Sequence, residues 1–195
     1  MKVVLASSNQ GKLAELKTLL TEHGFDLVSQ DQLGIAPAPE DGLTFVENAL
    51  AKARHASALS QLPAIADDSG IVVAALDGAP GIHSARYAGT QADDAANNRK
   101  LLAALTGQPD RRAHYYCAIV FLSSANDPAP LIATGSWSGQ IIDTARGDGG
   151  FGYDPYFLVP ELALTAAELP ASQKNQLSHR GQAVRAFLKQ LHNSK

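Results

Sequence analysis

The spacing of apolar residues changes twice within the first thirty positions. Residues 2–6 are mostly apolar and partly β-branched, which predicts a strand. From Lys12 to His23 leucines recur at helical spacing, and Gly24 supplies a left-handed stop. Residues 25–28 form a second short run with strand character. The chain is therefore expected to open with a strand, a turn, a helix and another strand.

Two further segments continue this alternation. Thr44 and Glu47 fit a capping box, and apolar residues carry the following helix to about Ser60. Residues 64–66 and 71–74 predict two strand segments with a polar interruption between them. The interruption is therefore expected to be a break in regular structure.

The second half of the chain predicts more helices and strands. The run at 115–122 is nearly continuous in its apolar residues, which is typical of a strand covered on both faces. The further expected elements are a helix from about Ala92 to Leu105, strands at 131–134 and 140–142, and an amphipathic helix from His179 onward.

Composition places the chain among ordinary globular proteins. Its 195 residues are 45% hydrophobic and 18% charged, which is enough for one sizeable core in one domain, either compact or two-lobed. The net charge of −3 argues against nonspecific binding of DNA or RNA, because such binders usually carry a basic face. We expect no nucleic-acid partner.

Cysteine usage and hydropathy indicate a cytoplasmic protein. The single Cys117 cannot form an internal disulfide. No signal-like leader precedes the first strand, and no apolar run approaches the ~20 residues of a membrane span. We therefore expect a cytoplasmic location without membrane contact.

The turn between the first strand and the first helix is a candidate phosphate site. Residues 7–12, Ser-Ser-Asn-Gln-Gly-Lys, bring hydroxyls, an amide and a lysine to the amino end of a helix, whose amide groups and dipole favour anions. The spacing is not that of a Walker A loop. The alternative is an ordinary strand-to-helix turn capped by Ser or Asn.

Carboxylates gather in two places. Glu40 and Asp41 lie in a proline-containing loop, and Asp67 and Asp68 follow the third apolar run. Successive strand residues point to opposite faces, so Asp67 and Asp68 are expected to diverge. The alternative for this pair is a turn rich in aspartate. Lys52 is expected to be a solvated charge, with phosphate contact as the weaker alternative.

Two segments near the carboxyl end also carry candidate chemistry. Residues 146–152 concentrate glycine, which permits close backbone approach, and Phe151 and Asp154 lie beside them. A hairpin loop is the alternative reading of the glycines. His179 and Arg180 start a helix, where positive charge opposes the dipole. We therefore expect a ligand or a carboxylate to pair with the positive charge of Arg180.

Taken together, these segments closely resemble the inosine/xanthosine triphosphate pyrophosphatase family. The resemblance runs from the first strand to the last helix. It is carried by Ser-Ser-Asn-Gln-Gly-Lys at 7–12, Asp-Asp-Ser-Gly at 67–70, Gly-Ala-Pro-Gly at 78–81, Phe-Gly-Tyr-Asp-Pro at 151–155 and Ser-His-Arg-Gly-Gln-Ala at 178–183.

The resemblance implies an α/β fold in which an elongated mixed sheet and its helices form two lobes around a central cleft. Residues 1–195 are then one bilobed domain. The implied activity is hydrolysis of dITP, ITP and XTP to the monophosphate and pyrophosphate, which removes deaminated purines from the nucleotide pool. The implied form is a homodimer with Mg²⁺ as cofactor.

The family's phosphate and metal sites map onto the first half of this chain. Glu40 and Asp68 are the implied metal ligands, and Asp68 is also the implied proton acceptor from the attacking water. Two carboxylates about 4 Å apart repel by about 4 kcal/mol at an effective dielectric near 20, which a divalent ion reverses. The implied phosphate-binding residues are Ser7, Ser8, Asn9, Gln10, Gly11 and Lys12, where Ser8 replaces the family's usual glycine.

The implied base site maps onto the second half. Arg180 only donates hydrogen bonds and ionised Asp154 only accepts them, which matches the 6-oxo and N1–H groups of hypoxanthine and mismatches adenine. Phe151 is the implied stacking partner, and Lys174 is expected to balance charge on the triphosphate together with Lys12. The remaining implied contacts are Ser69, Gly152, Tyr153 and His179.

Two alternatives stay open. One is a pyrophosphatase acting on other modified nucleotides, which would keep the phosphate machinery and change the pocket around Phe151 and Arg180. The other is a nucleotide sensor that binds without hydrolysis. The carboxylate pair argues against a sensor, because a simple binder of triphosphate gains little from negative groups beside it.

Overall fold

The computed structural model describes residues 1–90 and 93–193. Within them lie seven strands: β1 Lys2–Leu5, β2 Asp26–Ser29, β3 Ala64–Val73, β4 Arg112–Leu122, β5 Leu131–Ile141, β6 Phe157–Val159 and β7 Leu164–Thr165. The same residues form the α-helices α1 Gln10–Thr21, α2 Phe45–Ser60, α3 Asp94–Ala104, α4 Ala171–Leu177 and α5 His179–Asn193.

The strands belong to one mixed sheet. Its order is β2-β1-β3-β4-β5-β6-β7. Strand β1 pairs in parallel with β2 and with β3, whereas β6 pairs antiparallel with β5 and with β7. The predicted α/β class with a mixed sheet is confirmed.

The chain divides into two compact units. Unit 1 comprises residues 1–68, 117–135 and 180–195, and unit 2 comprises residues 69–116 and 136–179. The boundaries fall inside β3, β4 and β5, so each of these strands contributes one end to each unit.

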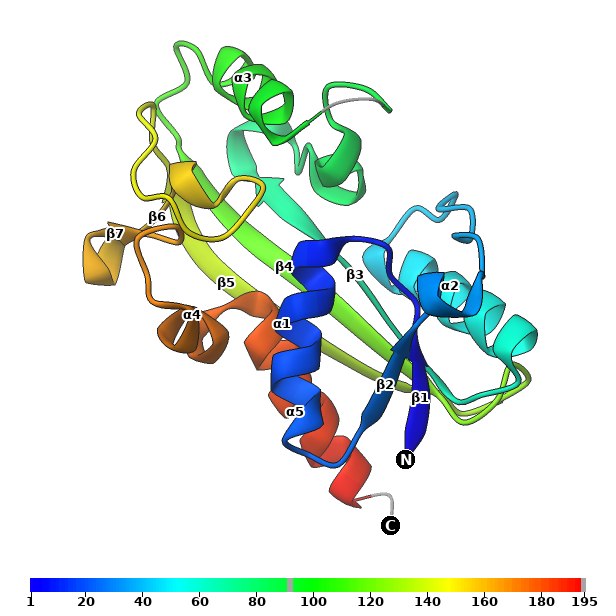
Figure 1. Ribbon diagram of the computed structural model, residues 1–195. Coiled ribbons are helices and arrows are strands. Elements are labelled where there is room, and N and C mark those ends of the chain that lie inside the picture. Colours follow the sequence, from blue (N-terminus) through cyan, green and yellow to red (C-terminus); the bar gives the residue numbers. More distant parts are fainter. Residues whose placement is uncertain (91–92, 194–195) are drawn as a thin grey trace. The chain divides into compact units, whose positions relative to one another are not determined.

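The core of unit 1 is built from leucines and aromatic rings. Leu16 and Leu20 of α1 are fully buried and pack in one cluster with Phe187 of α5. The Phe187 ring lies 5.9 Å from that of Phe25 and 5.8 Å from that of Phe121. Figure 1 shows α1 and α5 on one side of β1 and β3, and α2 on the other. The strand ends of unit 1 are therefore covered by helices on both faces.

Unit 2 has its own core, which is richer in aromatic residues. The rings of Tyr115 and Phe157 lie 4.6 Å apart, and that of Trp137 lies 5.3 Å from Phe157. Leu101 and Leu105, from α3 and its carboxyl end, complete the same cluster. Tyr153, one of the base-site candidates of the sequence analysis, belongs to this cluster.

Helix starts follow the predicted capping chemistry. The Thr44 side chain accepts a hydrogen bond from the Glu47 amide at 3.2 Å, and Glu47 Oε2 in turn accepts from the Thr44 hydroxyl at 2.8 Å. Asp93 caps α3 in the same way, through the Ala96 amide. Thr44 is confirmed as the cap of α2, and Glu47 reaches back to the Thr44 hydroxyl and to the Leu43 amide. The predicted start of the helix that corresponds to α3, near Ala92, lies outside the described residues.

Two predictions of secondary structure are wrong, and one helix was missed. The expected break at Asp67 is wrong, because β3 runs without interruption from Ala64 to Val73. The two strands expected at 131–134 and 140–142 are one strand, β5, in which buried and exposed residues alternate. Helix α4 was not predicted. The errors share a cause, since small and polar residues here occupy regular structure that tertiary contacts stabilise.

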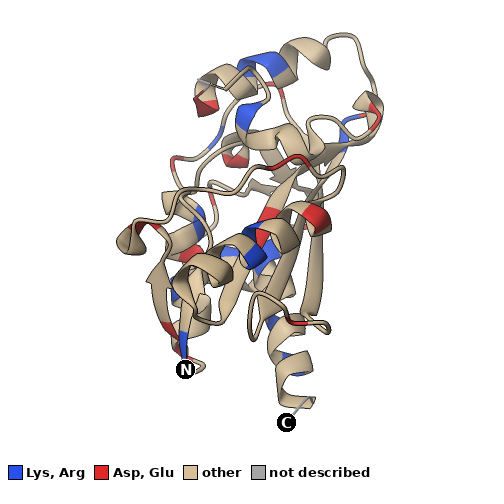
Figure 2. Ribbon diagram, turned by 90° about the vertical axis from the view of Figure 1, so that its right-hand side faces the viewer, with Lys and Arg blue, Asp and Glu red and all other residues tan. Residues whose placement is uncertain are grey.

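Charges are mixed along the chain. Figure 2 shows acidic and basic segments interspersed over the described ribbon. None of the helices in residues 1–90 and 93–193 is both long and apolar enough to cross a membrane.

Candidate active site

The turn at residues 7–12 closes on itself through its own side chains. Asn9 is the N-cap of α1, and its Oδ1 accepts from the Lys12 amide at 3.0 Å. Ser7 Oγ accepts from the Asn9 amide at 3.3 Å. The capped-turn reading is therefore confirmed, while phosphate binding by the same turn stays a prediction.

Ser8 takes a different direction from Ser7. Its hydroxyl donates to Asp31 Oδ1 and accepts from Gln30 Nε2, both at 2.9 Å. The positive-φ residues other than glycine in the described chain are Gln61, Asp77 and Ala163, so Ser8 has an ordinary backbone conformation. A serine thus fits here without the backbone freedom of glycine.

Asp67 lies between two cations. Its Oδ2 is 3.5 Å from Lys12 Nζ and accepts hydrogen bonds from Arg180 Nε and Nη2, both at 3.3 Å. Arg180 also pairs with Glu15 through Nη1. Asp67 and Arg180 are 0% and 2% exposed. Carboxylates therefore compensate the positive charge of Arg180 at the start of α5, which the helix dipole would otherwise disfavour.

The neighbours of Asp67 decide its ionisation. Burial alone raises the pKa of this carboxyl, but the positive charges of Lys12, Arg180 and Lys52 hold it well below its usual range. Asp67 is therefore a buried anion at all physiological pH values.

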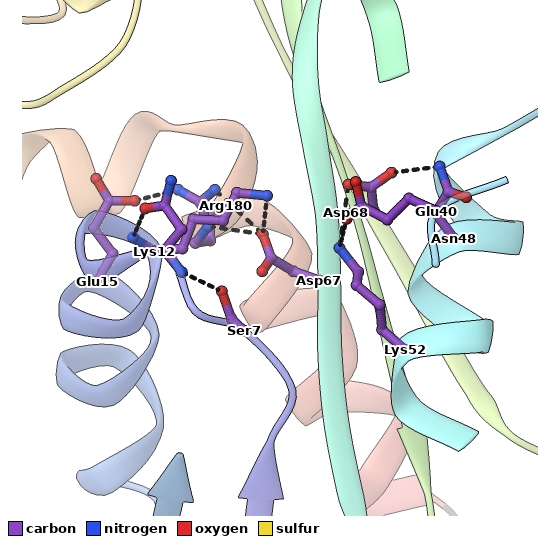
Figure 3. A network of polar contacts seen from close by, with 10 residues as sticks. Ser7, Lys12, Glu15, Glu40, Asn48, Lys52, Asp67, Asp68 and Arg180 are labelled. Atoms are coloured by element: carbon purple, nitrogen blue, oxygen red, sulfur yellow. Dashed lines mark hydrogen bonds and ion pairs between the residues drawn. The ribbon is translucent and has the colours of Figure 1, made fainter. Parts of the chain in front are cut away.

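Asp68 points to the other side of β3, as Figure 3 shows, and the predicted divergence of the two carboxylates is confirmed. Asp68 Oδ1 accepts from Lys52 Nζ at 3.3 Å, and Asp68 Oδ2 accepts from Asn48 Nδ2 at 3.2 Å. Burial raises the pKa of Asp68 even though Lys52 and Lys12 attract its anion. A buried carboxylate of raised pKa is a suitable general base.

Glu40 joins Asp68 through a shared lysine. Lys52 Nζ donates to Glu40 Oε1 at 2.9 Å while it also contacts Asp68. The Lys52 side chain is only 12% exposed, so the prediction of a solvated charge is wrong. Burial lowers the pKa of Lys52, but Asp68, Asp67 and Glu40 together raise it above its usual value.

The donor chemistry of Glu40 and Asp68 fits a hard divalent cation. Oxygen ligands suit Mg²⁺, which usually takes one or two carboxylates and completes its coordination with water and phosphate oxygens. The two side chains already converge on one positive group, the Lys52 ammonium. Among residues 1–90 and 93–193 no group of three or more His, Cys, Asp or Glu side chains is placed to hold a metal ion.

In unit 2, Asp154 is the centre of a buried polar cluster. Its Oδ1 accepts from the Tyr115 hydroxyl at 3.0 Å, and its Oδ2 accepts from the Phe151 amide at 3.0 Å and from Lys174 Nζ at 2.6 Å. Asp154 is 3% exposed. The Tyr115 ring also stacks on His179, with centroids 4.7 Å apart and planes at 10°.

Lys174 has different neighbours from those expected. Its ammonium pairs with Asp154 and lies 5.0 Å from the centre of the Phe151 ring. These are candidates for base recognition, whereas Lys12 contacts Asp67 in unit 1. The structure thus groups Lys174 with the base-site residues.

Gly152 and Tyr153 are held by backbone-directed hydrogen bonds. The Gly152 amide donates to Asp94 Oδ2 at 2.7 Å, and its carbonyl accepts from Asn98 Nδ2 at 2.9 Å. The Tyr153 hydroxyl donates to the Ser84 carbonyl at 2.8 Å. The glycine loop and the first turns of α3 line a cavity of about 490 Å³ that includes Phe151. The glycine loop therefore forms one side of this cavity and is held in place by hydrogen bonds to α3.

Comparison with known proteins decides the family. The sequence model of the Ham1 family matches residues 3–190. The chain belongs to the Ham1 family. The family predicted from the sequence is confirmed, because relatives of this Ham1-family chain are named dITP/XTP pyrophosphatase.

Two curated relatives show how far the similarity extends. A Ralstonia nicotianae protein named dITP/XTP pyrophosphatase is 57% identical over 193 residues, covering 97% of this chain and 96% of its own length. A Halorhodospira halophila protein of the same name is 58% identical over 190 residues, covering 96% of both.

Two solved structures share the fold. A HAM1 protein from Coxiella burnetii matches with a TM-score of 0.91 and 47% identity, covering 99% of both chains. A nucleoside-triphosphatase / dITP/XTP pyrophosphatase from Mycobacterium abscessus matches with a TM-score of 0.76 and 41% identity, covering 96% of this chain and 99% of its own.

The sequence analysis gave no role to Asn48, Tyr115 or Glu15 of this Ham1-family site, and it named Lys52 only as a solvated charge or a weaker phosphate contact. Asn48 and Lys52 are four residues apart on α2, which places both on one helix face toward Asp68, so their spacing carried a signal. Tyr115 and Glu15 carried none, because each lies inside an ordinary apolar or helical pattern. Ser69 lies half-buried in β3, directly after Asp68.

Proposed function

We propose that this Ham1-family chain hydrolyses deaminated purine nucleoside triphosphates, namely dITP, ITP and XTP, to the nucleoside monophosphate and pyrophosphate. The observation that carries the proposal is that the adjacent carboxylates Asp67 and Asp68 point to opposite sides of β3. Asp67 fixes the cations Lys12 and Arg180 on one side, and Asp68 joins Glu40 on the other. The relatives named dITP/XTP pyrophosphatase support the same activity.

The chemistry assigned to unit 1 is attack of water on phosphorus. Asp68 accepts the water's proton, and its raised pKa favours that role. Lys12 and the amino end of α1 bind phosphate oxygens of the substrate. Pyrophosphatases of this kind generally depend on a divalent metal ion. We propose Mg²⁺, held by Glu40 and Asp68, which would neutralise phosphate charge and polarise the reacting bond.

The residues of unit 2 recognise the base in this proposal. Phe151 stacks on the purine. An ammonium only donates hydrogen bonds, so Lys174 favours the 6-oxo group of hypoxanthine or xanthine over the 6-amino group of adenine. Both oxygens of Asp154 already accept hydrogen bonds, so its role is to hold Lys174 and the Phe151 backbone. His179 at the start of α5 completes this set, whereas Arg180 belongs to unit 1 and pairs there with Asp67 and Glu15.

We further propose that the two units act as one catalytic domain. The working form is a homodimer in the cytoplasm, where its substrates belong to the nucleotide pool. Sedimentation of the purified chain tests the oligomeric state, and a monomer at micromolar concentration would exclude the dimer.

The activity is tested by pyrophosphate release. With Mg²⁺, we expect ITP and XTP to release pyrophosphate at least about a hundredfold faster than ATP, since mismatched hydrogen-bonding groups cost two or more orders of magnitude. We also expect ITP and XTP to react faster than GTP, which shares the 6-oxo and N1–H groups, so this preference requires exclusion of the 2-amino group of guanine. Comparable rates on all four nucleotides would refute the specificity. Release of orthophosphate alone would refute the reaction class.

A matched pair of variants tests the catalytic assignment. Asp68→Asn removes the proton acceptor and should lower kcat by about a thousandfold or more with an unchanged circular dichroism spectrum. Asp41→Asn makes the same chemical change at an exposed position of the neighbouring loop and should leave kcat unchanged. Near wild-type turnover by Asp68→Asn would show that another group takes the proton.

A further inference from the structure

Lys52 stands where the proposed metal site needs space and negative charge. Its ammonium lies 2.9 Å from Glu40 Oε1 and 3.3 Å from Asp68 Oδ1, and so contacts both proposed ligands at once. The side chains of Lys52, Glu40 and Asp68 are 12%, 27% and 7% exposed, so solvent screens this cluster poorly. The Lys52 ammonium thus occupies the position between two carboxylates that a metal ion would take.

We propose that Lys52 is a built-in counter-ion that holds Glu40 and Asp68 together in the metal-free protein and leaves them when a divalent cation binds. This inference rests on the proposed metal assignment and deepens it. It assigns Lys52 the role of a positioning residue that also competes with the metal.

The first step of the argument is the cost of an empty carboxylate pair. Without a cation, Glu40 and Asp68 repel one another in a poorly solvated place. The other side-chain donor to Asp68 described here is Asn48, which is neutral and reaches only Oδ2. Lys52 therefore provides the compensating charge that keeps the pair assembled.

The second step is the conflict between two cations. A divalent ion bound to Glu40 and Asp68 takes the oxygens that Lys52 now contacts, and the ammonium would be a like charge beside it. Lysine carries its charge on a flexible four-carbon stem with rotatable donors, so Lys52 can withdraw without moving α2. A phosphate group of the substrate is a suitable new partner for the displaced ammonium.

A consequence follows for the order of binding. Because the metal must displace Lys52, it binds weakly to the free protein, and it binds more tightly once a polyphosphate receives the ammonium. Lys52 thereby couples loading of the cation to arrival of the triphosphate, which is a reciprocal coupling between two ligands.

The test counts bound metal directly, without nucleotide and without turnover. Full-length protein is titrated with Mn²⁺, whose free form is measured by electron paramagnetic resonance. Lys52→Met keeps the apolar stem and removes the charge, and we expect it to bind Mn²⁺ at least about tenfold more tightly than the wild type. Arg54→Met removes one positive charge from an exposed position of the same helix and should change affinity less than about twofold.

Thermal unfolding provides the second readout. Metal-free Lys52→Met should melt below the wild type, and Mn²⁺ should raise its melting temperature by more than that of the wild type, because linkage follows affinity. Lys52→Gln, which retains hydrogen-bond donors, replaces the methionine variant if the latter does not fold.

Each result separates the inference from the function. Equal or weaker Mn²⁺ binding by Lys52→Met overturns the counter-ion role. Loss of the tight binding in Lys52→Met/Glu40→Gln supports the assigned ligands. Mn²⁺ binding that survives this double change overturns the metal assignment together with the inference, and the pyrophosphate assay then reports separately whether the activity stands.

Discussion

Replacing Asp67 by asparagine should destabilise unit 1 strongly. The side chain is 0% exposed, and its Oδ2 lies 3.5 Å from Lys12 Nζ and 3.3 Å from two nitrogens of Arg180. At an effective dielectric near 20, each unit-charge pair at such distances attracts by about 5 kcal/mol before desolvation. Removing the charge takes one carboxylate away from the buried Arg180, which keeps its pairing with Glu15, so we expect a net loss of about 3–5 kcal/mol.

The assay is equilibrium unfolding in urea followed by far-ultraviolet circular dichroism, because α1, α2 and most of α5 belong to unit 1. The single Trp137 lies in unit 2, so its fluorescence reports the other unit in the same sample. Asp26→Asn is the matched control. This aspartate is exposed on β2, and its loss should change stability by about 0.5 kcal/mol or less.

The dependence on pH follows from the same charges. The pKa of Asp67 in the folded protein lies below its unfolded value, since Lys12, Arg180 and Lys52 outweigh the effect of burial. The stabilisation is therefore complete above the unfolded pKa and is lost as the pH falls through the folded one. We expect the difference in stability between wild type and Asp67→Asn to begin to shrink below about pH 4, the unfolded pKa, and to close only as the pH approaches the lower folded pKa. A loss under about 1 kcal/mol at neutral pH would refute the assigned pairing.

Three further variants or reagents test unit 2 and the core. Tyr115→Phe removes the hydroxyl that binds Asp154 but keeps the stack on His179, so KM for ITP should rise about tenfold with kcat nearly unchanged in steady-state assays. Gly70→Ala places a Cβ against a backbone carbonyl and a serine hydroxyl, so it should lower unfolding stability by about 3 kcal/mol, and a wild-type melting curve would contradict this packing. Burial raises the pKa of Cys117 to about 12, and Asp67 adds to the shift, so the native thiol should resist Ellman's reagent at about pH 8 and react on unfolding.

The elements predicted correctly are those whose ends are marked by residues close together in the sequence, such as caps and glycine stops. The β1 strand, helix α1 and the Thr44 capping box all depend on residues within a few positions of one another, so a sequence reader has the whole determinant in view. The same holds for the divergence of Asp67 and Asp68, which follows from the two-residue period of a strand once the strand is assumed.

Where the prediction failed, partners distant in sequence decide the structure. Asp67 and Asp68 disfavour strands by propensity, yet β3 continues through them. Lys52, expected in solvent, is half-buried, and its ammonium lies against both Glu40 and Asp68, which are 12 and 16 positions away in the chain.

The amino-acid sequence by itself determined the family, the α/β class and the identity of most reactive groups, since these reside in residue types and short spacings. Only the tertiary structure decided which charges meet. Arg180 reaches Asp67 across 113 positions of the chain, and Lys174 reaches Asp154 rather than a phosphate-site residue. Electrostatic pairing acts through space over a few ångströms, and no local periodicity records which distant residues the fold will bring within that range.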